Sequence, residues 1–399
     1  MKLRPWYLAF ACLVLGILLT DLCLSWFALG DGEFMGRPVP PYADVREERW
    51  QAWATRRREA AKRPGAPAQV LVHDGLLGWT NARDYRSTDG SQRTNSKGLR
   101  ATREFDSFPA PGTLRVALFG ESFIYGEEVP DGDEFAAQLA ALDPGLEPLN
   151  FGVSGFGTDQ ALMRLRSEGL DCHAQVYCIG VMLENIVRNV SRLTRLRNPY
   201  VKALGVKPRF RLEQGALTLV PSPFPAEQDV FDAVEAHTLP DLVRQYDAFA
   251  EAPYDQWIWK SSLARLWMGW RGSVARDYRL AWADEECEAF RVTLAILEAF
   301  DREARAAGAQ RVLVLIFPPK EDLALELAGD RRFGSVSRAL AQRGIEALDL
   351  TEPLAVRARE LAGAQTDPTA ISNQVFLRAH LNRIGNEVVA RAVRDRLGP

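Results

Sequence analysis

The stretch that decides the fold is LRVALFGESF, residues 114–123. A short apolar run of strand type ends on Gly120, and Ser122 follows two positions later. Because a glycine lets the chain turn sharply, this pattern predicts a buried parallel strand that delivers a hydroxyl group to the rim of a sheet. The serine would then stand at a helix N-terminus, where backbone N–H groups are free. Taken alone, a Gly-x-Ser turn is more often a helix cap than a nucleophile, so the other segments decide its meaning.

Length, net charge and cysteine spacing limit the number of domains and argue against nucleic-acid and metal binding. A chain of 399 residues has room for one large domain with appendages or for two domains. The net charge of −3 argues against a nucleic-acid surface. The five cysteines include no CxxC pair and no metal-ligand spacing, and we expect neither a metal nor another cofactor. Cys172 and Cys178 could pair if the chain is exported, or Cys178, which lies in an apolar run, could be a buried free thiol.

Residues 1–30 predict a membrane segment. Lys2 and Arg4 precede an apolar stretch over residues 6–30, which is long enough to cross a bilayer core of about 30 Å. Positive charge before the stretch and little directly after it predict a single-pass cell-membrane anchor, with the N-terminus inside and the remaining chain on the extracytoplasmic side. A cleaved signal peptide is the alternative, because small residues near 28–30 would allow cleavage.

Residues 31–112 predict a stalk and a lead-in that wraps the following domain. The proline-rich segment 37–41 is typical of a tether, and the charged stretch 46–63 is typical of a solvated stalk helix. Between residues 71 and 112, turn-forming residues alternate with apolar anchors. This pattern indicates ordered loop rather than linker.

An alternation of strand and helix patterns begins at residue 113. Strand patterns cover 114–119, 147–151, 175–182, 311–317 and 345–350, and helical patterns cover 133–142, 158–170, 284–307 and 383–397. The alternation predicts an α/β domain over residues 113–399, with a doubly wound, mainly parallel five-stranded sheet and helices on both faces. In open sheets of this kind, ligands bind beyond the C-terminal strand ends, which is where Ser122 would lie.

Residues 190–283 interrupt this alternation and predict an insertion near the mouth of the site. The insertion is rich in tryptophan, at Trp257, Trp259, Trp267, Trp270 and Trp282. Clustered tryptophans could stack on sugar rings, pack the insertion onto the core, or lie near the membrane.

Four segments carry polar groups to the predicted rim. Three of them follow strands and the fourth precedes the last helix: GES at 120–122, NFGVSGFG at 150–157, MLEN at 182–185 and HLNRIGN at 380–386. Because such turns converge on one edge of a doubly wound sheet, they bring together a hydroxyl, a glycine N–H, a side-chain amide and an imidazole. The first strand is not followed by GxGxxG spacing, which argues against a bound dinucleotide.

The order and content of these segments resemble the SGNH superfamily, also called GDSL-like esterases and acyltransferases. The resemblance covers the rim segments and the sheet order from about residue 113 to the C-terminus. In addition, LGW at 77–79 and NSKGLR at 95–100 look like membrane-anchored bacterial members, which are often tied to envelope or exopolysaccharide metabolism.

The resemblance implies a role for four residues. Ser122 would be the nucleophile and His380 the general base that activates it. Gly155 and Asn185 would form the oxyanion hole together with the backbone N–H of Ser122, because a tetrahedral intermediate needs preorganised donors.

Three positions depart from the family pattern. The usual aspartate before the nucleophile is Glu121, which keeps the charge, and the aspartate that usually follows the oxyanion-hole asparagine is Ile186. The family's orienting acid lies two or three residues before the histidine, where this chain has Arg378 and Leu377. Three arrangements are then open. The site could be a Ser–His dyad, or a carboxylate from elsewhere could orient the histidine, with Asp367 the nearest upstream candidate. The third alternative is a degenerate site without activity.

Three functions follow from these patterns. The first is a membrane-anchored serine esterase that hydrolyses an ester, such as an O-acetyl group on an envelope glycan, through an acyl-Ser122 intermediate. The second is an O-acyltransferase that uses the same residues, with a sugar hydroxyl as acceptor and a multi-spanning membrane partner that delivers the acyl group. The third is a catalytically degenerate protein that binds or assembles glycans on the same fold.

Overall fold

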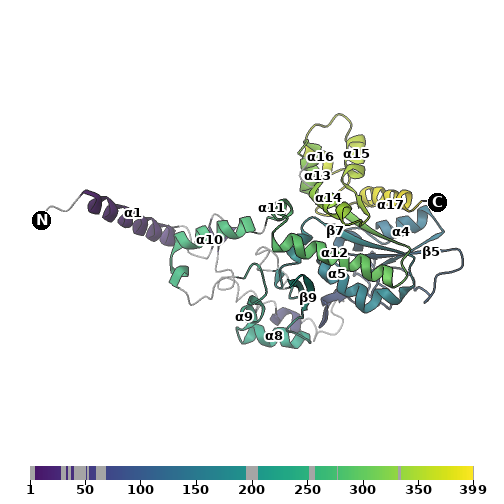
Figure 1. Ribbon diagram of the computed structural model, residues 1–399, viewed down its shortest axis with the longest axis horizontal. Coiled ribbons are helices and arrows are strands. Elements are labelled where there is room, and N and C mark those ends of the chain that lie inside the picture. Colours follow the sequence, from purple (N-terminus) through teal and green to yellow (C-terminus); the bar gives the residue numbers. More distant parts are fainter. Residues whose placement is uncertain are drawn as a thin grey trace. The chain divides into compact units, whose positions relative to one another are not determined.

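The computed structural model describes residues 5–27, 33–34, 37–39, 51, 54–59, 69–194, 205–250, 257–275, 277–330 and 334–398 (Figure 1). The chain divides into two compact units. The first comprises Met1–Arg63, Leu193–Gly205 and Gln228–Asp277, and the second comprises Pro64–Arg192, Val206–Glu227 and Tyr278–Pro399.

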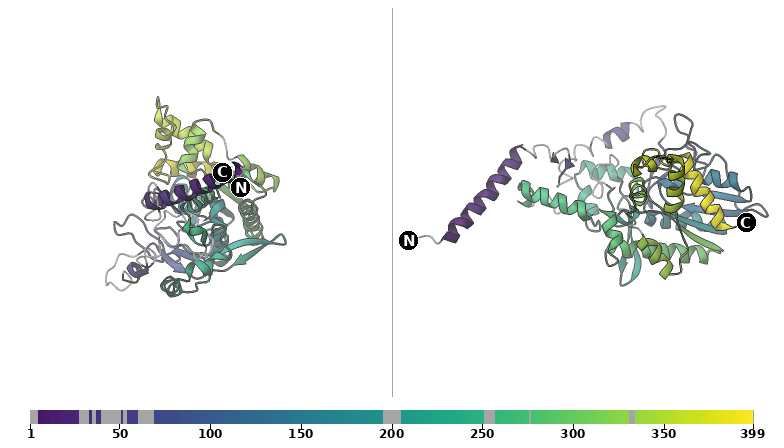
Figure 2. Two further views of the ribbon diagram at one scale, coloured as in Figure 1. Left: turned by 90° about the vertical axis from the view of Figure 1, so that its left-hand side faces the viewer. Right: turned by 90° about the horizontal axis from the view of Figure 1, so that it is seen from above.

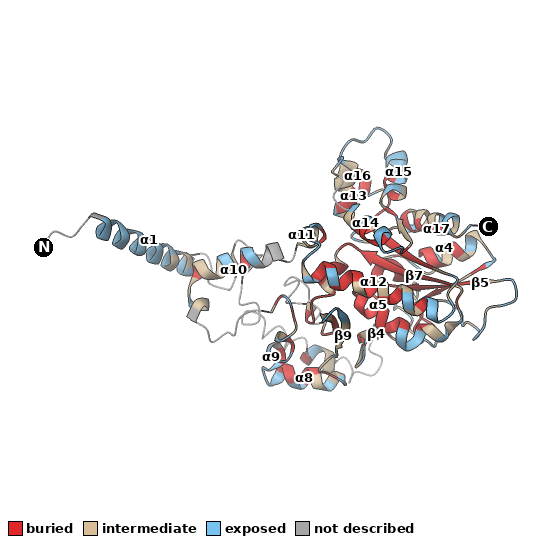
Figure 3. Ribbon diagram, viewed as in Figure 1, coloured by how far each residue is buried: buried red, intermediate tan, exposed pale blue. Residues whose placement is uncertain are grey.

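The second unit is built on the predicted parallel sheet. Its five strands are β5 (Leu114–Phe119), β6 (Leu146–Asn150), β7 (Val176–Met182), β10 (Arg311–Phe317) and β11 (Ala347–Asp349). They pair in parallel in the order β11-β10-β7-β5-β6. The predicted doubly wound α/β class is therefore confirmed, and each strand lies within a few residues of its predicted position. The apolar runs become strands because both faces of the sheet are covered (Figure 3).

Helices cover the two faces of the sheet (Figure 1). The cluster on one face joins the sheet to α4 (Phe135–Leu142), α13 (Lys320–Leu327), α15 (Thr351–Ala362) and α17 (Arg383–Leu397). The other face packs against α5 (Thr158–Arg164) and α12 (Glu288–Ala306). Side chains alternate between the faces along β5: Val116 and Leu118 join the first cluster, whereas the ring of Phe119 packs edge-on against Phe300 of α12 with centroids 5.6 Å apart.

The remaining elements of the second unit are short. They are β3 (Leu71–Asp74), β4 (Gly78–Asn81), α3 (Ser122–Tyr125), η2 (Leu165–Gly169), η3 (Leu170–Cys172), α6 (Asn185–Arg188), β8 (Arg209–Glu213), β9 (Ala216–Val220), α11 (Tyr278–Ala283), α14 (Gly334–Gln342) and α16 (Pro368–Ser372). Strands β3 and β4 form an antiparallel hairpin where the sequence predicted ordered loop. The predicted helix over 158–170 ends as α5 at Arg164 and continues as the π turn η2 and the 3₁₀ turn η3. Cys172 and Cys178 are both free thiols, and burial raises the pKa of Cys178 to about 12.

The first unit contains the apolar N-terminal helix. Its elements are α1 (Pro5–Phe27), β1 (Glu33–Phe34), β2 (Arg37–Pro38), α8 (Glu227–Glu235), α9 (Leu239–Arg244), η4 (Trp257–Lys260) and α10 (Ser262–Ala275). The segment Trp6–Trp26 of α1 is long and apolar enough to span a membrane. The C-terminal part of α1 meets the start of α10 (Figure 2). There the Asp21 carboxylate accepts hydrogen bonds from Ser261 Oγ at 3.0 Å and from Leu263 N at 2.7 Å.

The predicted insertion and the predicted stalk helix differ in detail from the structure. The predicted insertion over 190–283 does not form one body, since the β8–β9 hairpin belongs to the second unit and most of the remainder belongs to the first. Among its tryptophans, Trp282 is buried, whereas Trp267 and Trp270 are exposed. The side chains of Trp257 and Trp259 lie outside the described residues. So does most of the predicted stalk helix, of which residues 51 and 54–59 are described and helical.

Candidate active site

The candidate site lies where the strand order of the sheet reverses. Strands β5 and β7 are neighbours in the sheet, but the connection after β5 leads to β6 on one side and the connection after β7 leads to β10 on the other. In doubly wound sheets this switch point opens a crevice at the carboxyl ends of the strands. Ser122 follows β5 directly, and Asn185 follows β7.

Tight packing at the end of β5 sets the position of Ser122. Gly120 has φ +153°, and a Cβ atom there would lie 2.5 Å from Ile124 Cγ1 and 3.3 Å from Gly180 Cα. Only glycine fits this approach without a shift of the neighbouring chain. Helix α3 starts immediately afterwards, and the Glu121 carboxylate caps it by accepting a hydrogen bond from Phe123 N at 2.8 Å. Ser122 is thereby held at the first position of a short helix.

The structure brings Ser122 and His380 into hydrogen-bond contact. The distance from His380 Nε2 to Ser122 Oγ is 2.9 Å, although the two residues are 258 positions apart. His380 belongs to a tight turn that is closed by the Phe376–Leu381 bridge and by a hydrogen bond from Leu377 N to His380 O at 2.8 Å. With Nε2 unprotonated, this imidazole is placed to accept the proton of the serine hydroxyl.

The hydroxyl of Ser122 also faces a second acceptor. Its Oγ lies 3.0 Å from Glu121 Oε2. Glu121 is buried, and burial raises its pKa, while Phe123 N, Arg188 and Ser122 act in the opposite direction. Ser122 Oγ donates to Glu121 Oε2, so Glu121 and His380 are alternative acceptors for the same hydroxyl proton.

The turn after β6 is packed against the nucleophile turn. Val153 N donates to Gly120 O at 3.0 Å. A Cβ atom on Gly152 would lie 2.4 Å from Tyr125 N, so this glycine allows the two turns to touch. Gly155 follows with φ +81° on an exposed part of the turn. Among the residues that the structure describes, the N–H groups of Gly155 and Ser122 donate to no acceptor, which leaves both for an oxyanion.

Asn185 holds the turn after β7 to the turn after β6. Its Oδ1 accepts from Met182 N at 2.7 Å, and its Nδ2 donates to Phe156 O at 3.2 Å. Phe156 O also accepts from Arg188 NH1 at 3.1 Å. One of the two N–H bonds of the Asn185 amide is thus used inside the protein, and the whole residue is buried. Behind the same turn, Trp282 Nε1 donates to Leu183 O at 2.7 Å.

The β3–β4 hairpin also holds the turn after β6 through side-chain hydrogen bonds. Asn81 Nδ2 donates to Gly152 O at 2.8 Å, and Trp79 Nε1 donates to Ser154 O at 3.0 Å. The indole of Trp79 also lies 3.5 Å from the position that a Cβ atom on Gly155 would take. The lead-in segment therefore contacts the same turn that carries a predicted oxyanion donor.

Asp367 does not occupy the position of an orienting acid. Its carboxylate caps α16 by accepting from Ala370 N at 2.9 Å. The carboxylates next to His380 come instead from the segment after α3: Glu128 Oε1 lies 3.5 Å from Nδ1, and Glu127 Oε2 lies 3.8 Å from Nε2. Sequence reasoning missed these two residues. The only signal for them is a pair of acidic residues close behind the predicted nucleophile.

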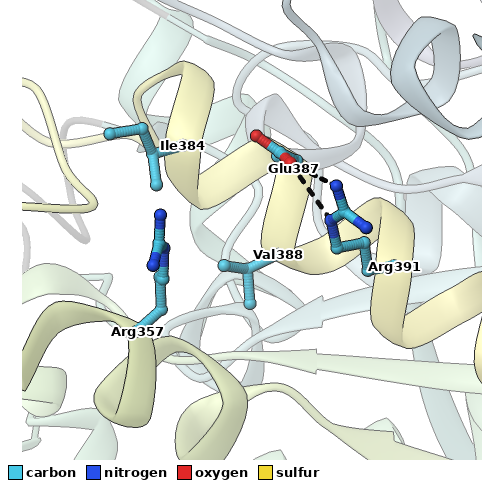
Figure 4. Close-up of a pocket in the computed structure, with 5 residues that line it drawn as sticks. All are labelled: Arg357, Ile384, Glu387, Val388 and Arg391. Atoms are coloured by element: carbon cyan, nitrogen blue, oxygen red, sulfur yellow. Dashed lines mark hydrogen bonds and ion pairs between the residues drawn. The ribbon is translucent and has the colours of Figure 1, made fainter. Parts of the chain in front are cut away.

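A separate depression of about 310 Å³ lies between α15 and α17 (Figure 4). It is lined by Arg357, Ile384, Glu387, Val388 and Arg391. Glu387 and Arg391 pair with each other at 2.7 Å across one turn of α17. None of the lining residues is one of the candidate catalytic residues.

Comparison with known proteins gives similarities of fold. No family model matches the chain, and no curated protein matches it. Among solved structures, it is similar to a member of the lipolytic protein G-D-S-L family from Veillonella parvula, with 12% identity, a TM-score of 0.33, and coverage of 70% of this chain and 96% of that one. It is also similar to a catalytic mutant of Axe2, an acetylxylan esterase from Geobacillus stearothermophilus, with 11% identity, a TM-score of 0.36, and coverage of 72% and 95%. At such identities and TM-scores, these similarities describe the fold alone.

Proposed function

We propose that this chain is an SGNH-type serine esterase. The observation that carries the proposal is the 2.9 Å contact between His380 Nε2 and Ser122 Oγ at the switch point of the sheet. A hydroxyl paired with an imidazole, beside unpaired backbone N–H groups, is the arrangement that acyl transfer requires.

The reaction follows from the atoms in place. Ser122 Oγ attacks the acyl carbonyl carbon while His380 Nε2 takes its proton. The oxyanion is stabilised by the N–H groups of Ser122 and Gly155 and by the second N–H of the Asn185 amide. When the intermediate collapses, the ester C–O bond breaks and His380 returns the proton to the leaving alcohol. Water, activated by His380, then attacks acyl-Ser122 and releases the acid.

The substrate class that we propose is an O-acetyl or other acyl ester on an envelope glycan. An apolar helix of membrane-spanning length supports this choice, because an anchored enzyme on the extracytoplasmic side would work on the envelope. Transfer of the acyl group to a sugar hydroxyl would use the same residues, so the acceptor must be tested directly.

The test uses the full chain in detergent, beside Ser122→Ala, His380→Ala and the matched control Ser154→Ala. Ser154 lies on the neighbouring turn, and its side chain takes no part in the proposed chemistry. A fluorophosphonate probe should label the parent and the Ser154→Ala variant but not Ser122→Ala. Release of acetate from an acetyl ester should fall by about 10⁶-fold in Ser122→Ala and by a similar factor in His380→Ala.

Addition of a glycan acceptor separates the candidate functions. Free acetate as the main product supports the esterase, whereas acetylated glycan would identify a transferase. Absence of both labelling and turnover in a folded parent chain would contradict both catalytic functions and favour a degenerate binding protein.

A further inference from the structure

We propose that Glu128 is the carboxylate that orients His380, in place of the acid that the family carries shortly before its histidine. The juxtaposition that carries this inference is the 3.5 Å approach of Glu128 Oε1 to His380 Nδ1. The inference rests on the proposed esterase function, because an orienting acid has meaning only where His380 acts as a base.

The nitrogen that Glu128 faces needs an acceptor. His380 Nδ1 is buried and has no hydrogen-bond partner among the described residues. A shortening of about 0.5 Å would turn the approach of Glu128 into a hydrogen bond, and such bonds are commonly long until substrate binds. Donation from Nδ1–H to Glu128 fixes the tautomer in which Nε2 is free to accept the proton of Ser122.

The second oxygen of Glu128 is tied to the turn that holds the base. Glu128 Oε2 accepts from Arg378 N at 3.1 Å and from Ala379 N at 3.4 Å. These two residues directly precede His380. The carboxylate is therefore anchored by one oxygen to the backbone of the histidine turn while its other oxygen is aimed at the imidazole. Arg378 stands where the family has its acid, and it contributes a backbone N–H to the replacement.

The backbone of Glu128 is unusual and indicates a specific placement. Its φ is +71°, in the left-handed region that non-glycine residues seldom enter. Such a conformation persists only where other contacts hold it. The Glu128 carboxylate contacts Arg378, Ala379 and His380. We infer that these contacts hold the left-handed backbone in place.

The surroundings single out Glu128 from the other carboxylates that face His380. Glu127 approaches Nε2, the nitrogen that must stay free for Ser122, and its side chain is 41% exposed, against 21% for Glu128. Glu121 bonds the serine hydroxyl instead. Lys320 Nζ donates to the carbonyl oxygens of Leu377 and Arg378 at 3.2 and 3.3 Å, so these hydrogen bonds go to the backbone of the histidine turn and not to the imidazole.

The charge state of Glu128 agrees with this role. Burial opposes its ionisation, but the charge of His380 and the N–H donors of Ala379 and Arg378 together hold the pKa of Glu128 below its ordinary value. The group is thus an anion at neutral pH, as stabilisation of an imidazolium requires.

The test compares Glu128→Gln with Glu127→Gln in the full chain. Glutamine keeps the shape of the side chain but presents an amide donor to Nδ1, which favours the unproductive tautomer of His380. We expect kcat to fall by about 10²–10⁴-fold in Glu128→Gln and to stay within about threefold in Glu127→Gln. The acid limb of the kcat/KM profile should also move to lower pH in Glu128→Gln by about one unit, because the imidazolium loses its partner.

A second variant guards against misfolding. Glu128→Gly suits φ +71° without strain, so a loss of turnover in that variant cannot be ascribed to an unfavourable backbone. The proposal is overturned if Glu128→Gln and Glu128→Gly both keep kcat and the acid limb of the parent, or if Glu127→Gln alone loses activity. It also falls if the folded parent is not labelled at Ser122, but that result removes the esterase function itself and is recognised before any variant is compared.

Discussion

At the scale of single residues, two carboxylates beside one Ser–His pair have pKa shifts of opposite sign because their surroundings differ. Glu121 is fully enclosed, and burial raises its pKa. Glu128 is partly exposed and receives two backbone N–H donors, and its pKa is lowered. Environments that separate the pKa values of neighbouring acids commonly assign them separate roles. Glu121 contacts the hydroxyl end of the pair, and the role proposed for Glu128 lies at the imidazole end.

The buried acid Glu134 predicts a pH dependence of stability. Burial raises the pKa of Glu134 from 4.5 to about 6, with Arg100 acting in the opposite direction. Because the folded state holds this proton more tightly than the unfolded state, the stabilisation is present below pH 4.5 and is lost as the pH rises through 6. The ionised group therefore costs about 2 kcal/mol of unfolding free energy at pH 7.

The substitution Glu134→Gln should remove this cost. We expect a gain of up to about 2 kcal/mol at pH 7 and no gain at pH 4, measured by urea unfolding followed by tryptophan fluorescence. The glutamine side chain keeps an oxygen that can accept from Gly132 N, as the carboxylate of Glu134 does at 2.8 Å. An equal effect of the substitution at both pH values would contradict this account.

Ser122 and His380 were predictable from the sequence, and Glu128 was not. The first two stand at element boundaries, where the chain order alone places them on one rim. Glu128 reaches His380 only through a left-handed backbone and through contacts with residues 250 positions away. Asp367 is the nearest upstream acid in the sequence, but Asp followed by Pro368 is a helix-start pattern, and its carboxylate caps the local helix instead.

At the scale of elements, the strands were predictable because both of their faces are covered. An apolar run such as Val176–Met182 has no polar face to confuse its assignment. The β3–β4 hairpin was missed because its polar side chains do not alternate with a solvent face. They bond the turn after β6 instead, as Trp79 does to Ser154 O and Asn81 to Gly152 O. Such tertiary partners leave no periodic signal in the sequence.

The contact between the two turns of the site predicts the effect of Gly152→Ala. A Cβ atom there would lie 2.4 Å from Tyr125 N and 2.8 Å from Ile124 C, and both are backbone atoms that cannot rotate away. We expect a loss of about 1–3 kcal/mol in stability. Displacement of the turn that carries Gly155 by about 1 Å should also lower kcat by about 10²-fold.

The matched control is Gly334→Ala at the start of α14. Among the residues that the structure describes, none lies within 4 Å of a Cβ atom there, so the substitution should leave kcat and the unfolding midpoint near those of the parent. Thermal unfolding and steady-state hydrolysis on both variants check the prediction. Parent-like values for Gly152→Ala would mean that the two turns separate without consequence.

At the scale of the whole molecule, the N-terminal helix bears on where the chemistry takes place. The 21 residues Trp6–Trp26 would extend about 32 Å, which matches a hydrocarbon core of about 30 Å. Almost all of their side chains are left uncovered by the rest of the protein, as expected for a segment that lipid would cover. The one acidic residue of the span, Asp21, is bonded to the start of α10, so its carboxylate does not face lipid unpaired.

We therefore expect the full chain to be retained in the membrane rather than released by signal cleavage. Intact mass of the purified protein should include residues 1–27, and the chain should stay in the membrane pellet after carbonate and dissolve only in detergent. Protease added to intact spheroplasts should digest the domain that holds Ser122, because positive charge precedes the span and little follows it directly. A mature protein that begins near residue 30 and leaves the membrane in carbonate would instead identify a cleaved signal. Protection from external protease would place the esterase site on the cytoplasmic side, where an envelope glycan is not its substrate.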